Sequence, residues 1–179
     1  MFNVEKATND CIQWIRDWRE ENGPGCTLIV GISGGVDSLV AAKLCVEAVG
    51  TDKVLGVIMP NYKQDDIDVA YDICQHVLGI DYLTINIGSA YDDIIDQIDF
   101  AFDATDQTLI NLAPRLRMAT LYGVSQSHNG RVVNTCNLSE DYIGYATRYG
   151  DAAGDFAPLA QFTKGEVKSI GYYLGLPKK

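Results

Sequence analysis

The alternation of strand-like and helix-like segments is the feature that most restricts how this chain can fold. Short, continuously apolar runs such as TLIVGI (27–32) and KVLGVIM (53–59) are typical of parallel strands that are covered on both faces. Each such run is followed by a segment in which apolar residues recur every three or four positions, as in an amphipathic helix. This alternation predicts an α/β fold in which a parallel sheet has helices on both faces and right-handed crossovers.

The individual elements follow from the same patterns. The segment 112–127 reads as a helix although it contains Pro114, which we expect in the first turn because a helix tolerates proline best there. The predicted strands are 27–32, 53–59, 82–87 and 131–135, and the predicted helices run from Val4 to the turn sequence NGPG and over 36–49, 67–78, 89–102, 112–127 and 164–175.

Size, charge and cysteine content narrow the class of protein. The 179 residues suit one domain, and no repeat, low-complexity tract or linker divides them. A formal charge of −10 disfavours binding to a nucleic-acid backbone, which requires Lys and Arg. The five cysteines are scattered and include no C-x-x-C pair, which indicates reduced thiols rather than disulfides or a zinc site. With no secretory signal and no apolar segment of membrane-spanning length, we expect a cytoplasmic protein without membrane or nucleic-acid partners.

The stretch GISGGVDS (31–38) follows the first predicted strand and contains the strongest functional signal. Its glycines allow close approach of an anion to backbone N–H groups, and the helix that starts near Val36 adds a partial positive charge. Ser33 and Ser38 supply hydroxyl groups. Asp37 would repel a phosphate unless a cation lies between the two charges, so this combination indicates a nucleotide phosphate with Mg²⁺ and Asp37 as a metal ligand.

A glycine-rich loop alone is a weak signal, because Gly and Ser are common in turns and Asp often caps helices. The stretch fits neither the Walker A pattern nor the dinucleotide fingerprint. It resembles the S-G-G-x-D-S pyrophosphatase loop of adenylating enzymes related to GMP synthetase, asparagine synthetase and the tRNA thiolation enzymes. That resemblance implies cleavage of ATP between its α- and β-phosphates, with ATP bound by Gly31, Ile32, Ser33, Gly34, Gly35, Val36, Asp37 and Ser38.

Four motifs in the second half narrow the family further. They are NLAPRLRMATLYG (111–123), NTCNLSE (134–140), GYATRYGDAAGDFAPLAQFTKGEV (144–167) and GYYLGLP (171–177), and in this order and spacing they are similar to ammonia-dependent NAD synthetase. The resemblance implies a Rossmann-like PP-loop (adenine nucleotide alpha hydrolase) fold over a single domain, 1–179. It also implies a homodimer that uses ATP and ammonia to amidate deamido-NAD to NAD through an NAD-adenylate, releasing AMP and pyrophosphate.

Site residues follow from matching positions in these motifs. The resemblance implies that Glu140 shares Mg²⁺ with Asp37; a helix-capping role for Glu140 is the less favoured alternative. Arg117 matches no ligand position, and we expect a solvated or structural role for it. The remaining implied ligands are Thr135 and Lys164 for ATP, and Arg115, Arg148 and Asp155 for deamido-NAD.

The chain departs from the family pattern in a few places. Arg148 stands where the family usually has Lys, and Val36 replaces a Gln found in many bacterial members. The family pattern also continues well beyond LGLPKK, so we expect this chain to bind MgATP and to form NAD poorly. A non-catalytic nucleotide-binding protein and another PP-loop adenylating enzyme, such as a tRNA thiolation enzyme, remain the alternatives.

Overall fold

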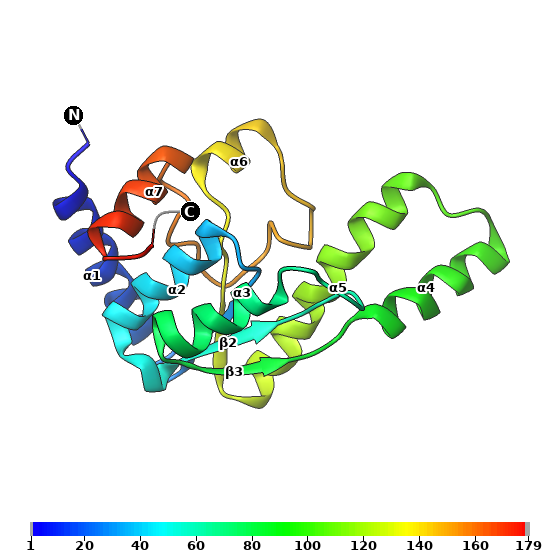
Figure 1. Cartoon of the computed structure of the whole chain (residues 1–179), viewed down its shortest axis with the longest axis horizontal. Coiled ribbons are helices and arrows are strands. Elements are labelled where there is room, and N and C mark those ends of the chain that lie inside the picture. Colours follow the sequence, from blue (N-terminus) through cyan, green and yellow to red (C-terminus); the bar gives the residue numbers. More distant parts are fainter. Residues whose placement is uncertain (1, 178–179) are drawn as a thin grey trace.

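Four parallel strands form the sheet at the centre of the molecule (Figure 1). The computed structural model describes residues 2–177. The strands are β1 (Thr27–Gly31), β2 (Val54–Ile58), β3 (Asp81–Thr84) and β4 (Gly130–Val133), and their order across the sheet is β3-β2-β1-β4. The order reverses at β1, because β2 lies on one side of it and β4 on the other. In open α/β sheets, ligands bind beyond the carboxyl ends of the strands at such a point.

Helices cover both faces of this sheet, as the sequence predicts. The alternating side chains of β1 show how: Leu28 and Val30 pack into the core formed with α1, α2 and α7, whereas Ile29 packs with α5 on the opposite face, and all three are fully buried. The helices are α1 (Val4–Asn22), α2 (Val36–Val49), α3 (Ile67–Asp72), α4 (Gly88–Ala101), α5 (Asp106–Ser127), α6 (Leu138–Ile143) and α7 (Lys164–Tyr173), with a short 3₁₀ turn η1 (Thr51–Lys53) and a π-helical segment η2 (Ile73–Leu78).

The predicted position of Pro114 is wrong. Helix α5 starts at Asp106, six residues before the predicted start, so Pro114 lies inside the helix rather than in its first turn. Thr105 determines the earlier start, because its side chain caps the helix by accepting a hydrogen bond from the Thr108 N–H at 3.2 Å. A proline inside a helix leaves one carbonyl of the preceding turn without its helical donor. The helix accommodates this loss within its 22 residues.

The third predicted helix and the third predicted strand are among the other elements that differ from the prediction. The predicted helix 67–78 changes from α-helical to π-helical geometry at Ile73. Strand β3 ends at Thr84 because its neighbour β2 ends at Ile58, although the Ile85 N–H still donates to the Ile58 carbonyl at 2.9 Å. Helix α6 is an additional element that the apolar pattern did not reveal.

Helix α4 and the first half of α5 form a hairpin that projects away from the sheet (Figure 1). Large apolar side chains on this hairpin lie in solvent, with Phe100 92%, Phe102 70% and Ile110 67% exposed. No helix among residues 2–177 is both long and apolar enough to cross a membrane.

Candidate functional site

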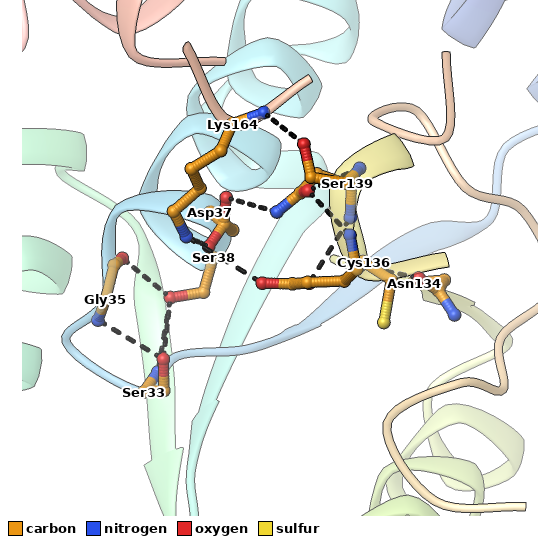
Figure 2. Close-up of polar contacts among 10 residues, drawn as sticks. Ser33, Gly35, Asp37, Ser38, Asn134, Cys136, Ser139 and Lys164 are labelled. Atoms are coloured by element: carbon orange, nitrogen blue, oxygen red, sulfur yellow. Dashed lines mark hydrogen bonds and ion pairs between the residues drawn. The ribbon is translucent and has the colours of Figure 1, made fainter. Parts of the chain in front are cut away.

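The loop between β1 and α2 is a tight turn held by hydrogen bonds of its two serines (Figure 2). The Ser33 and Ser38 hydroxyl oxygens lie 3.1 Å apart, and Ser38 Oγ donates to the Gly35 carbonyl at 3.1 Å. The Gly35 N–H donates to Ser33 Oγ at 3.2 Å, and Gly34 adopts a φ of +84°, which favours glycine. Within residues 2–177, no side chain caps the start of α2. The first N–H groups of α2 are therefore oriented to bind an anion.

This loop forms one side of a cavity of about 590 Å³ at the carboxyl ends of the strands. The loops after β2 and β4, one face of α5, Glu140 of α6 and the segment at 151–153 form the rest of the wall, so the cavity lies where the strand order reverses. Of the residues predicted to bind ATP or metal, the structure brings Gly31, Ile32, Ser33, Gly35, Asp37, Ser38, Thr135 and Glu140 to the wall. Gly34, Val36 and Lys164 are not among the described residues that line it; the Val36 side chain packs against the hydrophobic core.

Asp37 and Glu140 come together beside the ammonium group of Lys164. Lys164 Nζ forms an ion pair with Asp37 Oδ2 and lies 3.8 Å from Glu140 Oε1 (Figure 2 shows Lys164 and Asp37). Although Lys164 is not in the cavity wall, its positive charge thus lies between two carboxylates that border the cavity. Carboxylate oxygens are hard donors of the kind that Mg²⁺ prefers, and phosphate oxygens and water would have to supply the remaining ligands. Among residues 2–177, no group of three or more His, Cys, Asp or Glu side chains is placed to hold a metal ion.

Glu140 also caps a helix, the role that the sequence reading disfavoured. Its Oε2 atom accepts a hydrogen bond from the Asn137 N–H at 3.4 Å, while Asn137 Oδ1 accepts from the Glu140 N–H at 3.2 Å. This reciprocal capping box starts α6 and orients the Glu140 side chain. The capping alternative is therefore confirmed, while the metal role stays a prediction: one carboxylate oxygen caps the helix and the other faces Lys164.

The residues predicted to bind deamido-NAD lie on the surface rather than among the described cavity-lining residues. Arg115 Nε donates to the Arg148 carbonyl at 3.2 Å, and the Arg148 guanidinium lies 4.9 Å from the centre of the Tyr149 ring. Asp155 is tied to β4, because its Oδ2 accepts from the Val132 N–H at 2.6 Å. Their role in binding deamido-NAD stays a prediction.

Arg117 is a cavity residue that the sequence reading missed. Its Nε donates to the Met59 carbonyl at 3.0 Å, which is the expected structural role, but the side chain also lines the cavity. Burial lowers the pKa of the Arg117 guanidinium. Helical spacing could have revealed this position, because Pro114, Arg117, Met118 and Leu121 follow an i, i+3, i+4, i+7 pattern and all line the cavity. Arg115 falls outside that face and is exposed.

Polar residues after β2 were also missed. The loop after β2 brings Asn61, Lys63 and Gln64 to the cavity wall. Within residues 2–177, Asn61 Oδ1 is buried and has no hydrogen-bond partner, so it can accept a hydrogen bond from a bound ligand. The position of this loop could have indicated its role. It directly follows a strand and therefore lies at the same edge of the sheet as the loop at residues 31–38.

The cysteines are all free thiols in buried positions, as predicted. Cys136 is the cysteine beside the cavity, and its Sγ donates to the Asp151 carbonyl at 3.1 Å. Burial, and then the nearby charges of Asp151 and Glu140, raise the pKa of Cys136 to about 12. A thiol with this pKa stays protonated near neutral pH and is a poor nucleophile.

Comparison with known proteins identifies the family. The family model described as NAD synthase matches residues 7–179. The chain belongs to the NAD synthase family. An NH(3)-dependent NAD(+) synthetase of Thermococcus kodakarensis is 44% identical over 98% of this chain and 68% of its own length. The corresponding protein of Pyrococcus furiosus is 38% identical over 99% of this chain and 66% of its own length. The chain thus spans about two thirds of these relatives.

Solved structures of NAD synthase family relatives share the fold. An NH3-dependent NAD synthetase from Campylobacter jejuni is 31% identical, with a TM-score of 0.88 over 98% of this chain and 75% of that one. A structure described as an NMN synthetase, from Francisella tularensis, is 32% identical, with a TM-score of 0.89 over 99% of this chain and 73% of that one. These neighbours confirm the predicted PP-loop α/β fold.

Proposed function

We propose that this chain catalyses the ATP-dependent amidation of deamido-NAD to NAD with ammonia as the nitrogen donor. The observation that carries this proposal is the cavity itself. In a chain of the NAD synthase family, a glycine-rich turn and an uncapped helix start face two carboxylates that share one ammonium group. A site with these groups can bind a polyphosphate together with a divalent cation.

ATP binding would use the loop at residues 31–38. The N–H groups at the start of α2 and the hydroxyl group of Ser33 would donate hydrogen bonds to phosphate oxygens, and the Ser38 hydroxyl could do so by turning its proton away from the Gly35 carbonyl. Mg²⁺ held by Asp37 and Glu140 would offset the phosphate charge and polarise the α-phosphorus. The ammonium group of Lys164 would then leave Asp37 Oδ2 and bind a phosphate oxygen. In this way Mg²⁺ would neutralise Asp37, and Lys164 would neutralise part of the phosphate charge.

The reaction has two steps. A carboxylate oxygen of the nicotinate group attacks the α-phosphorus of ATP, the bond between the α-phosphorus and the bridging oxygen breaks, and pyrophosphate leaves. Ammonia then attacks the acyl carbon of the adenylate and loses a proton, and AMP leaves with the bonding electrons. Catalysis depends on holding ATP and deamido-NAD, two polyanions, with their reacting atoms aligned. Arg115, Arg148 and Asp155 would bind deamido-NAD for this purpose. Arg117 places a further positive charge at the cavity wall.

A product assay with the purified chain tests this function. We expect ATP to yield AMP and pyrophosphate in equal amounts only when deamido-NAD is present, and NAD to form only when ammonium is added, and then slowly, as the sequence predicts. Deamido-NMN serves as a comparison substrate, because the Francisella relative is described as an NMN synthetase. Cleavage of ATP to ADP and phosphate, or pyrophosphate release that does not depend on deamido-NAD, would contradict the proposal.

The projecting hairpin of α4 and α5 supports a second part of the proposal, a homodimer. Phe100, Phe102 and Ile110 are large apolar side chains exposed on it, and exposed apolar side chains that gather on one element are typical of association sites. A cytoplasmic location, where thiols stay reduced, accords with the five free cysteines.

Light scattering at micromolar concentration tests the dimer. We expect twice the mass of one chain for the wild type, and a dimer dissociation constant at least about tenfold larger in Phe100→Glu, because this change places a charge in an apolar interface. Tyr142→Glu is a matched control, since Tyr142 is similarly exposed at 88% but lies on α6. A wild-type chain that is only monomeric would refute the dimer.

A further inference from the structure

Asn137 is a fully buried polar residue that contacts both carboxylates of the candidate metal site. Its side-chain Nδ2 donates to Asp37 Oδ1 at 3.1 Å, across 100 positions of sequence. Its own backbone N–H donates to Glu140 Oε2 at 3.4 Å. Neither its type nor its place in NTCNLSE distinguished it in the sequence.

The amide oxygen and the amide nitrogen of Asn137 have different hydrogen-bond partners. Oδ1 caps α6 by accepting from the N–H groups of Ser139 at 3.0 Å and Glu140 at 3.2 Å. Any good capping residue, such as Ser or Asp, could accept these bonds. Capping alone therefore does not require an amide, whereas the Nδ2 donor to Asp37 does.

The start of α6 is in turn held against α7, the helix that carries Lys164. The Lys164 N–H donates to Ser139 Oγ at 3.1 Å, and the Leu138 N–H donates to the Phe162 carbonyl at 2.9 Å. Asn137 is therefore anchored through α6 and reaches α2 through its amide. Asn137 therefore connects Asp37 with Glu140 from a fixed, buried position. A contact between exposed side chains could exchange partners more easily.

The two carboxylate oxygens of Asp37 have different partners. Asn137 holds Oδ1 from a buried position, whereas Lys164, a flexible side chain that is 43% exposed, pairs with Oδ2. Losing the buried amide contact would leave a polar group unsatisfied, but Lys164 can move into solvent or onto a phosphate. Oδ2 is thus the oxygen that can be released to a cation.

We propose that Asn137 is a positioning residue that fixes Asp37 and Glu140 relative to each other, so that Asp37 offers a divalent cation its Oδ2 atom. This inference rests on the proposed function, because it assumes that the two carboxylates bind the cation of a metal–nucleotide complex. Asn137 itself holds Asp37 through the opposite oxygen and makes no contact with the cation.

The test compares Asn137→Ser and Asn137→Asp with the wild type. Both variants keep an oxygen that can cap α6, and both lose the amide donor to Asp37. Mn²⁺ serves as the probe, and its affinity is measured by electron paramagnetic resonance at saturating ATP, alongside ATP binding in chelator without metal. The controls are Asn3→Ser and Asn3→Asp, because Asn3 Oδ1 caps α1 by accepting from the Lys6 N–H at 3.0 Å, far from the cavity.

We expect both Asn137 variants to weaken Mn²⁺ binding by about tenfold or more, as loss of a hydrogen bond to a charged group does, while metal-free ATP binding changes less than threefold. The Asn3 variants should leave both affinities unchanged. Mn²⁺ affinity within twofold of wild type in either Asn137 variant would overturn the proposal. An effect in Asn137→Asp alone would also overturn it, because added charge and not the lost donor would then be the cause.

A second measurement does not depend on ligand binding. The fall in thermal unfolding midpoint caused by Asn137→Ser should be smaller in an Asp37→Ala background than in the wild type, because the contact is already absent there. Equal falls in both backgrounds would overturn the proposal. If the wild-type chain binds neither ATP nor Mn²⁺–ATP, the proposed function fails, and this cycle still decides whether Asn137 holds Asp37.

Discussion

Asp37→Asn is expected to lower the rate of deamido-NAD-dependent pyrophosphate release by about 10³-fold or more. The substitution keeps the size of the side chain and an oxygen that can accept from Asn137 Nδ2, so the start of α2 should be preserved. It removes the negative charge that pairs with Lys164 and would bind Mg²⁺. Loss of a charge that stabilises the transition state is worth about 4 kcal/mol, which corresponds to a factor of about 10³.

The rate is measured at limiting and at saturating Mg²⁺, because a damaged metal site should respond to the metal concentration. Asp10→Asn is the control: Asp10 is exposed on α1 and pairs with Lys6, so its loss should leave the rate unchanged. We expect a similar unfolding midpoint for both variants, since a partly exposed ion pair contributes little to stability. A near-normal rate for Asp37→Asn at limiting Mg²⁺ would rule out Asp37 as a metal ligand.

Much of the fold could be predicted because its determinants are local. Apolar runs such as TLIVGI gave the strands, and the spacing of apolar residues gave six of the helices. A predicted helix boundary was wrong where a polar contact determines the start of the helix. Thr105 caps α5, so that this helix starts at Asp106, before Pro114. Helix α6 starts with a capping box at Asn137 and Glu140, a signal that the apolar pattern does not contain.

The candidate site was predictable in part. The loop at residues 31–38 was found from its composition and its place after a strand, and the structure brings Thr135 and Glu140 to the same cavity. Asn137 could not be found in this way, because its importance depends on a contact with Asp37, 100 residues away. Arg117 was not predicted to line the site because it matches no ligand position of the family. Helical spacing nevertheless places it on the face of α5 that lines the cavity.

Cysteine chemistry distinguishes amidation of deamido-NAD from the tRNA thiolation alternative. That chemistry needs a reactive thiolate, but burial raises the pKa of Cys136, the cysteine beside the cavity, to about 12. The pKa of Cys11 is likewise raised to about 12 by burial. Both thiols stay protonated near neutral pH. With family members at 44% and 38% identity described as NH(3)-dependent NAD(+) synthetases, amidation is the better supported function.

Binding of MgATP tests the central claim most directly, because every step of the proposed reaction begins with it. In a calorimetric titration of the purified chain, we expect one MgATP to bind per chain with a Kd below about 1 mM, in the range usual for enzyme substrates. Lys164→Met should weaken this binding by about tenfold or more, since it removes a charge-assisted contact to phosphate. Saturable binding that Lys164→Met weakens is the predicted result. The absence of saturable binding by the wild-type chain would contradict the assignment of residues 31–38 as an ATP-binding loop.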